Sequence, residues 1–303
     1  MTCGSPSADR PTGCAQAEMS FLPDDLGVQS SARAEGEVRG PQWRQGSVRL
    51  REDVGTMPYI SVSALSHEGL VREHNEDSLV VGPWTLCGTV TENPQTLLFP
   101  FGTPCVVAVA DGLGGHPGGE IASALVARRL ALVGPGLDSE AAVRDALDAC
   151  NRAVYAVAAG DPELTAMGTT VAGVVLMPET VLVFNVGDSR VYDASGDGLR
   201  RLSVDDSPPP APGHRTTSIV TQTLGGSVHP TTIEAHVTGS APATGARYLV
   251  CSDGLTDPVP DEALEDVLSE HTDGRAAFEL WKAAIEAGGP DNITLALVRI
   301  GAQ

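Results

Sequence analysis

Three apolar runs follow one another closely in the middle of the chain. They span Thr169–Leu176, Thr180–Val186 and Ser189–Ala194, and Met177-Pro-Glu179 separates the first two. Their valine-rich composition predicts β-strands. Connections this short are typical of antiparallel neighbours, because a parallel crossover needs a dozen or more residues. The chain is therefore expected to build much of its fold from antiparallel sheet.

A fourth apolar run, Cys105–Ala110, is continuous instead of alternating, which is typical of a strand buried on both faces. Sheets made of such strands need helices outside them. Further strands are expected at Ile60–Leu65, Arg247–Cys251 and Ile293–Ile300, and helices at 119–133, 139–159, 261–270, with Asp261 as N-cap, and 275–287. We expect an α+β fold of two packed, mainly antiparallel β-sheets flanked by helices on both outer faces, an α-β-β-α sandwich.

Residues 1–57 differ from the rest of the chain. They are rich in Gly, Ser, Pro, Arg and Glu and show no sustained hydrophobic period, which is typical of a flexible tail. The apolar pair Phe21-Leu22 could be a short docking element or have no role. Residues 58–303 are expected to form one folded domain. Within it, the proline-rich stretch Ser207–Gly213 can continue neither a sheet nor a helix, so about 203–224 should be a surface loop.

The net charge of -20 makes the chain a poor candidate for binding nucleic acid or anionic lipid. No segment approaches the roughly 20 apolar residues of a membrane helix, and the N-terminus carries no apolar stretch of signal-peptide length. The cysteines, at positions 3, 14, 87, 105, 150 and 251, form no Cys-X-X-Cys pair, which argues against zinc or disulfide frameworks. We expect a soluble, cytoplasmic protein with Cys105 and Cys251 in the core.

Aspartates stand where the apolar runs begin or end. Asp111, Asp188 and Asp253 each follow such a run, Asp291 precedes the last one, and Asp77 precedes Val80-Val81. If these ends meet at one edge of the sandwich, four or five carboxylates share a small volume. Their repulsion would raise their pKa values unless divalent cations were bound. Oxygen ligands without His or Cys select hard ions such as Mg²⁺ or Mn²⁺.

Each aspartate taken alone also fits a simple turn. Asp111 and Asp253 are followed by glycine, and Asp-Gly after a strand is often just a turn. The segment Gly187–Arg190 could be a hairpin turn with an internal Asp–Arg pair. The glycine after Asp111 has a second interpretation, since close approach of its backbone would let the Gly112 carbonyl act as a metal ligand. The metal hypothesis depends on several sites agreeing.

Six motifs then follow in order: Ser66–Asp77, Val109–His116 with Gly119–Ser123, Met167–Thr170, Gly187–Arg190, Cys251–Asp257 and Gly288–Thr294. With these motifs, about residues 59–300 resemble the metal-dependent protein serine/threonine phosphatases called protein phosphatase 2C, most closely the bacterial branch. The ordered set is specific, whereas the glycine-rich segment Gly112–Gly115 alone would only weakly indicate a nucleotide-binding loop.

The resemblance implies a hydrolase that uses Mn²⁺ or Mg²⁺, with two core ions and a weaker third. A metal-activated water would attack the phosphoryl group of phosphoserine or phosphothreonine in proteins directly, without a phosphoenzyme. Asp111 would bridge the core ions, with the Gly112 carbonyl on one of them, and Asp253 and Asp291 would hold the other. Asp188 would share the third ion with Asp253.

The same resemblance gives roles to the first motif. Asp77, with Glu76 beside it, would act through metal-bound water, and Arg72 would bind the substrate phosphate. Arg72, Asp111 and Asp253 are thus the candidate catalytic residues. The implied partners are phosphorylated proteins and, through them, a Ser/Thr kinase. We expect the protein itself to be a monomer.

Leu113 stands where some members of the family carry a general-acid His, which the bacterial branch generally lacks as well. Two departures from the family pattern matter, and the first is that His67 replaces an acidic residue that is not a metal ligand. His74 and His116 are nearby in sequence but are expected to be structural or solvent-facing. The segment Ser203–Leu224, which forms a flap beside the active site in the family, is shorter and richer in proline. Substrate preference therefore cannot be inherited from the family.

Other functions remain open at this point. A catalytically silent member of the fold could bind phosphoproteins, although no expected metal aspartate is missing. A related hydrolase could act on a small phosphorylated metabolite. A nucleotide-binding module around residues 112–119 would need a parallel βαβ unit, which the hairpin-rich pattern disfavours.

Overall fold

The structure is a computed structural model that describes residues 58–113, 118–196, 198–213, 215–243 and 245–302. The expectations for residues 1–57, including Phe21-Leu22, lie outside the described residues, as do those for His116.

The first sheet has six antiparallel strands in the order β10-β9-β13-β14-β1-β4. They are β10 (Gly198–Arg201), β9 (Arg190–Gly196), β13 (Arg247–Cys251), β14 (Ile293–Ala302), β1 (Pro58–His67) and β4 (Gln95–Pro100). The long β1–β14 ladder runs from Pro58↔Ala302 to His67↔Ile293, so the two strands form the centre of this sheet.

The second sheet also has six antiparallel strands, in the order β12-β8-β7-β5-β2-β3. They are β12 (His236–Ser240), β8 (Val181–Val186), β7 (Val171–Leu176), β5 (Cys105–Ala110), β2 (Ser78–Val81) and β3 (Trp84–Cys87). A small two-stranded ladder pairs β6 (Gly168–Thr169) with β11 (Leu224–Gly225).

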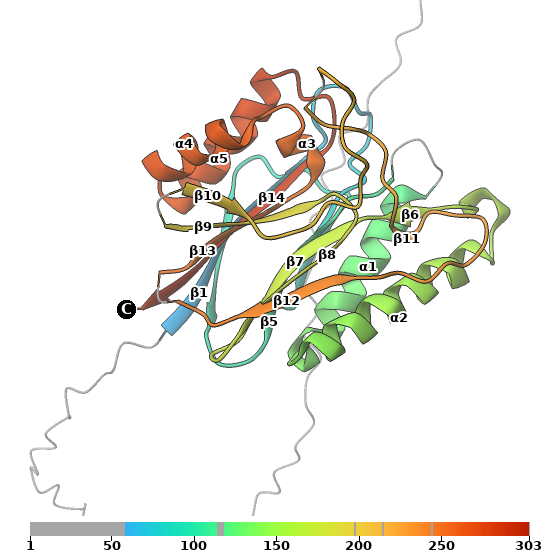
Figure 1. Ribbon diagram of the computed structural model, residues 1–303, viewed down its shortest axis with the longest axis horizontal. Helices are drawn as coiled ribbons and strands as arrows, with labels where there is room; N and C mark the ends of the chain where they lie inside the picture. The colour runs from blue at the N-terminus through green and yellow to red at the C-terminus, as the bar shows by residue number, and fades with distance from the viewer. Residues whose placement is uncertain (1–57, 114–117, 197, 214, 244, 303) are drawn as a thin grey trace, which may run out of the picture. The chain divides into compact units, whose positions relative to one another are not determined.

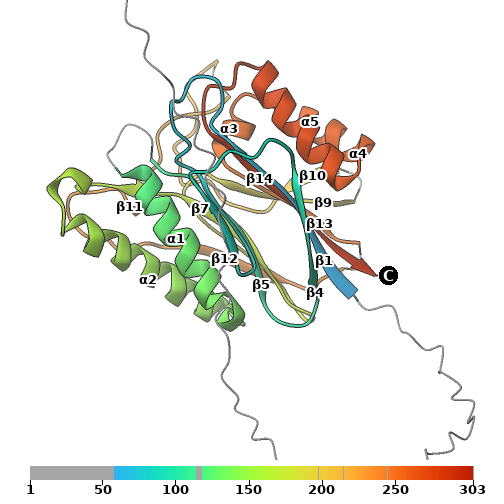
Figure 2. The ribbon, with the colours of Figure 1, turned by 180° about the vertical axis from the view of Figure 1, so that it is seen from behind.

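Helices cover the outer face of each sheet, and Figures 1 and 2 show the four layers from opposite sides. On the second sheet lie α1 (Gly119–Val133) and α2 (Glu140–Ala158), and on the first lie α3 (Asp253–Thr256), α4 (Asp261–Glu270) and α5 (Asp273–Glu286). Two short 3-10 turns occupy Gly134–Gly136 and Pro162–Leu164. The expected α-β-β-α sandwich is confirmed.

The alternation of side chains along β5 explains why its sequence is apolar throughout. Val107 and Val109 point into the layer between the two sheets, where they meet residues of the facing sheet such as Val298. Val106 and Ala108 belong to the opposite layer, between the second sheet and its helices. A strand buried on both faces has no position left for a polar side chain.

The local predictions hold for most elements, with two corrections. Asp261 does not cap α4, because the N-cap is Pro260 and Asp261 is the first helical residue; its carboxylate accepts a hydrogen bond from the Tyr192 hydroxyl at 3.0 Å. The segment Gly187–Arg190 is not a hairpin turn, since β8 and β9 belong to different sheets. The chain crosses between the sheets there.

Candidate metal centre

Asp77 and Asp111 come together because β2 and β5 are paired. The ladder ends at Ser78↔Ala110, so the residue before one strand lies opposite the residue after the other. The backbone of Asp111 is held in addition by the third sequence motif: its carbonyl accepts hydrogen bonds from Thr170 N at 2.9 Å and from Thr169 Oγ1 at 2.7 Å. Both carboxylates therefore stand on rigid strand ends of the second sheet.

Asp253 and Asp291 come from the first sheet. Ser252 follows β13 and pairs with Thr294 of β14, so Asp253 opens α3 directly beside the segment that carries Asp291. This approach requires glycine after Asp253, because a Cβ on Gly254 would overlap the Asn292 carbonyl. Glycine at position 254 therefore allows the segment that carries Asp253 to pack closely against the segment that carries Asp291.

A hydrogen bond joins the ends of the two sheets. The buried Ser252 hydroxyl donates to Asp77 Oδ2 at 2.9 Å, while it accepts from Thr294 N at 3.0 Å. The segments that carry the aspartates of the two sheets therefore lie side by side at this edge of the sandwich.

The electrostatics of this cluster are unfavourable without a cation. Burial, and then the charges of Asp77, Asp253, Asp188 and Asp291, raise the pKa of Asp111 well above its ordinary value. Burial, followed by the charges of Asp188, Asp257 and Asp291, does the same to the pKa of Asp253. Asp111 and Asp253 still keep part of their surface open to solvent, so they are recessed groups at an opening. Cations entering there would relieve the repulsion.

Two buried oxygens in the described part of the chain have no hydrogen-bond partner at this edge, Asp77 Oδ1 and Glu76 Oε2. Burial raises the pKa of Asp77 to about 6, although hydrogen bonds from Thr294 and Ser252 oppose the rise. Burial and then Glu120 raise the pKa of Glu76. Buried acceptors without donors are rare in folded proteins and call for an ion or water.

Gly112 lies in a backbone cradle beside Asp111. A Cβ at this position would come within 2.5 Å of the Gly119 carbonyl oxygen and 2.7 Å of the Glu76 carbonyl oxygen. Only glycine fits, and Leu113 N is held by the Gly168 carbonyl at 3.1 Å. The Gly112 backbone thus packs against Gly119 and Glu76, and its use as a metal ligand stays a prediction.

No three His, Cys, Asp or Glu side chains among the described residues are grouped so that they could together hold one ion as they stand. Mg²⁺-like ions commonly take only one or two carboxylates and keep several waters. The donor set fits such hard cations, because among the described residues it contains no sulfur or imidazole that would favour a softer metal.

Asp188 lies in the crossing between β8 and β9 and is buried. Burial raises its pKa to about 6, with Asp205 and Asp257 adding to the rise. Arg190 does not pair with Asp188, because its guanidinium is bound to Asp205 with an NH2–Oδ2 distance of 2.8 Å. Asp188 is thus left facing the other carboxylates instead of closing a local turn.

Arg72 reaches the cluster from the loop after β1. Its NH2 atom lies 2.7 Å from Asp291 Oδ2, and both side chains are partly exposed. The loop is clamped by Asn292, whose Nδ2 donates to the carbonyls of Glu68 at 3.0 Å and His74 at 2.8 Å. A guanidinium fixed at the rim of an acidic site is well placed to bind a phosphoryl group.

A family model described as protein phosphatase 2C matches residues 101–288, more than half of the chain. The chain belongs to the protein phosphatase 2C family. The resemblance found from the six motifs is thereby confirmed, together with its fold.

Two relatives and one solved structure illustrate the similarity. The serine/threonine protein phosphatase PstP of Mycobacterium tuberculosis is 33% identical over 253 residues, which cover 78% of this chain and 44% of that protein. The serine/threonine phosphatase stp of Listeria monocytogenes is 31% identical, covering 76% of this chain and 92% of that protein. The crystal structure of the PstP catalytic domain in complex with two manganese ions is 30% identical, with a TM-score of 0.65, and covers 80% of this chain and 99% of that one.

The chain spans less than half the length of the first of these relatives.

The sequence does not predict a functional role for two residues of the site. Asp257 lies four residues after Asp253, and burial raises its pKa; the i, i+4 spacing on a helical turn is the signal that could have found it. Asn292 bonds Glu76 N through Oδ1 at 2.8 Å and clamps the Arg72 loop through Nδ2. An amide between Asp291 and a strand gives no comparable signal in the sequence.

The departures from the family pattern have simple local explanations. His67 Nδ1 accepts from Gly69 N at 2.9 Å, and its ring lies 5.3 Å from that of Trp281, so it is structural. His74 is exposed.

The Pro-rich segment is a loop, as expected, and a pocket of about 370 Å³ separates it from Asp188 and Asp253. Arg215 of this loop donates to the Asp257 carbonyl at 3.0 Å, which ties the loop to the site.

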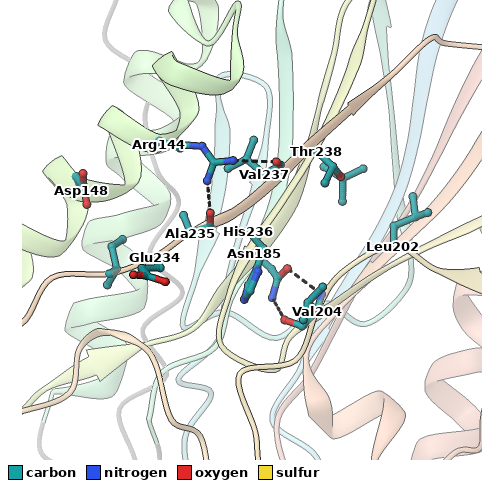
Figure 3. Close-up of a pocket in the computed structure, with 12 residues that line it drawn as sticks. Arg144, Asp148, Asn185, Leu202, Val204, Glu234, Ala235, His236, Val237 and Thr238 are labelled. Carbon is teal, nitrogen blue, oxygen red and sulfur yellow. Dashed lines mark hydrogen bonds between the residues drawn. The ribbon is translucent and has the colours of Figure 1, made fainter.

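A larger pocket of about 510 Å³ lies elsewhere, between α2 and β12 (Figure 3). Arg144 bridges it by donating to the Ala235 and Val237 carbonyls, and Asn185 bonds Val204 on the other side. None of the predicted site residues lines it. Size alone therefore does not mark the site of chemistry here.

Two other expectations can be compared with the structure. Every pairing between named strands in the described residues is antiparallel, so the parallel βαβ unit that a nucleotide-binding module needs is not found there.

Cys105 and Cys251 are buried in the core, as predicted, and the four described cysteines are free thiols. None of the helices described is both long enough and apolar enough to cross a membrane.

Proposed function

We propose that this chain is a metal-dependent protein serine/threonine phosphatase. The observation that carries the proposal is the hydrogen bond from Ser252 to Asp77, which joins the strand ends that bear Asp77 and Asp111 to those that bear Asp253 and Asp291. It is supported by the family membership and by the orphaned oxygens at the same edge. A guanidinium at the rim, Arg72, completes the set of groups that phosphoryl transfer needs.

The residues divide between the ions as follows. Asp111 would hold both core ions, the Gly112 carbonyl would bind one of them, and Asp253 with Asp291 would bind the other. Divalent ions there would supply a water of lowered pKa and positive charge facing the phosphoryl oxygens. Mn²⁺ and Mg²⁺ both suit this all-oxygen donor set.

The outer residues of the site have supporting roles. Asp77, with one oxygen held by Ser252 and the other free, orients water at the core, and Glu76 assists from the adjacent position. Asp188 and Asp253 take a weaker third ion. These roles account for Asp77 and Asp188, which do not belong to the proposed core set of Asp111, Asp253 and Asp291.

Arg72 binds the phosphate of the substrate with a two-pronged hydrogen bond and so positions phosphorus for attack. This use requires the guanidinium to exchange part of its contact with Asp291 for phosphoryl oxygens. The reaction proceeds by direct attack of water on phosphorus, without a phosphoenzyme. The leaving serine or threonine oxygen takes its proton from solvent in the site, since Leu113 occupies the position of a possible acid.

The substrates are phosphorylated proteins, and the biological partner is a Ser/Thr kinase that phosphorylates them. We further propose that the protein acts in the cytoplasm as a monomer. These assignments rest on the family, on the acidic composition and on the irregular spacing of the cysteines, not on a contact in the structure.

Hydrolysis of p-nitrophenyl phosphate and of a phosphothreonine peptide, each with Mn²⁺, Mg²⁺ or EDTA, tests the proposal. Activity on both substrates that requires metal and disappears with EDTA is expected. Activity on the small ester alone would favour a hydrolase of phosphorylated metabolites. Inactivity of folded, metal-loaded protein on both would favour a silent phosphoprotein-binding member of the fold.

A further inference from the structure

Two large apolar side chains stand exposed directly beside the phosphate-binding arginine. Leu70 is 63% exposed and Val71 is 68% exposed, and Arg72 follows them in the chain. Single exposed apolar residues are ordinary on protein surfaces and need no explanation. An adjacent pair at the rim of a site that holds a charged substrate group is more specific.

The exposure of this pair is not the result of a loose loop. Leu70 N donates to the Gly289 carbonyl at 2.8 Å, and Asn292 holds the loop on both sides through Glu68 and His74. Gly69 packs so closely on the Asp291 backbone that a side chain at position 69 would not fit. The fold therefore presents Leu70 and Val71 to solvent in a fixed position.

Leu70 and Val71 directly precede the arginine that is proposed to bind the phosphate. Arg72 contacts Asp291 at 2.7 Å, so its guanidinium marks where a phosphoryl group binds. The residues next to a phosphoserine or phosphothreonine lie only about 3.3–3.6 Å further along an extended peptide for each position. A neighbouring substrate side chain thus comes within reach of the loop that carries Leu70 and Val71.

The charge around the loop selects the chemistry of that neighbour. Glu68 and Glu73 flank Leu70, Val71 and Arg72 in the sequence, the charges of Asp291 and Glu76 act on Arg72, and the whole chain carries -20. An acidic residue beside the phosphoresidue would be repelled. An apolar side chain would instead remove apolar surface from water on both partners, at about 25 cal/mol per Å².

We propose that Leu70 and Val71 form a subsite for an apolar side chain adjacent to the phosphoresidue. The preferred substrates are then phosphoproteins in which the phosphoserine or phosphothreonine is flanked by aliphatic residues and not by acidic ones. This inference rests on the proposed phosphatase function and adds a specificity that the shortened flap leaves undefined.

Three phosphothreonine peptides of equal length test this subsite, with Leu, Ser or Asp on both sides of the phosphoresidue. The wild-type protein with Mn²⁺ should hydrolyse the Leu peptide with a kcat/KM about tenfold above the Ser peptide, the effect of about 1.4 kcal/mol. The Asp peptide should be the poorest. A wild-type preference for the Ser or Asp peptide, or equal rates on all three, would overturn the inference.

Val71→Thr is the decisive variant, because threonine keeps the shape of valine and replaces one methyl group with a hydroxyl. Leu70→Ser is a weaker probe, since Leu70 also packs against Gly289. In Val71→Thr the Leu-to-Ser ratio of kcat/KM should fall by at least about threefold. A ratio is internal to each variant, so a general loss of folding or metal cannot produce it.

Leu132→Ser is the matched control. Leu132 is 82% exposed on α1, about 20 Å along the helix from Gly119 at 1.5 Å per residue. Its ratio should equal that of the wild type, and an equal fall in both variants would overturn the subsite. p-Nitrophenyl phosphate has no flanking residue, so it distinguishes failure of the subsite from failure of the proposed function. If the wild type hydrolyses this ester with metal and hydrolyses all three peptides at equal rates, only the subsite is rejected. If the wild type hydrolyses neither the ester nor the peptides, the proposed function is rejected as well.

Discussion

The Ser252 hydroxyl donates to Asp77 Oδ2 at 2.9 Å and so joins the two sheets at their carboxylate edge. Ser252 follows a strand of the first sheet, and Asp77 precedes a strand of the second. The same hydroxyl accepts a hydrogen bond from Thr294 N, so one buried group links the two sheets at the edge where the predicted ligands lie.

Replacing this hydroxyl should destabilise the protein and disturb the site. In Ser252→Ala, Asp77 Oδ2 and Thr294 N both lose a buried partner, which costs about 1–3 kcal/mol of the free energy of unfolding. Urea unfolding measures this loss, and Mn²⁺ titration should show weaker binding. Ser269→Ala removes an exposed hydroxyl bond to Asp266 and serves as the control. Equal stability of the two variants would refute the bridging role.

Neutralising the central carboxylate should separate stability from metal binding. Asp111→Asn removes one charge from a repulsive cluster, so the protein in EDTA should melt at a higher temperature than the wild type. A gain of about 1 kcal/mol would raise Tm by about 2–4 °C in a domain of this size. Asp253→Asn should behave in the same way.

The metal-dependent activity of these variants should change in the opposite direction. We expect kcat to fall by more than about 100-fold, beyond the loss caused by removing an outer-shell partner of a metal. Mn²⁺ should also raise Tm less than in the wild type, since ligands stabilise only the state that binds them. An unchanged Mn²⁺-induced shift in Tm, or near-normal turnover, would remove Asp111 from the site.

Arg72 should act mainly on substrate binding. Arg72→Ala removes charge-assisted hydrogen bonds worth about 1.5–3 kcal/mol, so kcat/KM for a phosphopeptide should fall about 10- to 100-fold, chiefly through KM. Steady-state kinetics at saturating Mn²⁺ measures the change. Arg200→Ala is the control, because Arg200 also pairs with an aspartate, Asp193, but on an exposed edge strand. Unchanged KM and kcat in Arg72→Ala would rule out the phosphate role.

A separate ion cluster predicts how stability depends on pH. Asp273 lies between Arg299, at 2.6 Å from Nε, and Arg247, at 2.7 Å from Nε. Burial alone would raise the pKa of Asp273, but the two guanidiniums outweigh it and lower the pKa below its ordinary value. Burial lowers the pKa of Arg247, yet a guanidinium stays protonated throughout this range.

A carboxylate with a lowered folded pKa stabilises the protein above its unfolded pKa and loses that contribution as pH falls through the folded value. Asp273→Asn should therefore be destabilised at pH 7, by on the order of 2 kcal/mol for a partly buried network. The difference from wild type should be constant above about pH 5 and shrink below about pH 4. Urea unfolding across pH 3–7 measures it, and a difference that grows toward low pH would contradict the assignment.

The parts of the fold that could be predicted are those with a strong local pattern. The continuous apolar sequence of Cys105–Ala110 predicts a strand buried on both faces. The structure confirms this prediction, because alternate residues of the strand belong to two different hydrophobic cores. The edge strands β4 and β12 were missed, since β12 buries only Val237 fully and β4 alternates between half-buried and exposed residues. An edge strand needs only backbone pairing, which leaves little trace in side-chain hydrophobicity.

The assignment of strands to sheets depends on contacts that no local pattern encodes. β8 and β9 are four residues apart yet belong to different sheets, because Gly187 adopts a positive φ of 102° and turns the chain between the layers. The site shows the same limit. Asp111 and Asp253 stand out at strand ends, whereas Asn292 acquires its clamp only when the Arg72 loop folds onto it.

Crystals of the wild-type protein grown with Mn²⁺ and measured at the manganese absorption edge test the central claim most directly. Two strong anomalous peaks are expected at the meeting point of the sheets, both adjoining Asp111, with one beside the Gly112 carbonyl and the other beside Asp253 and Asp291. The same crystals of Asp111→Asn should lose at least one peak. Ordered, metal-soaked wild-type protein without anomalous density at this edge would contradict the metal centre and the function built on it.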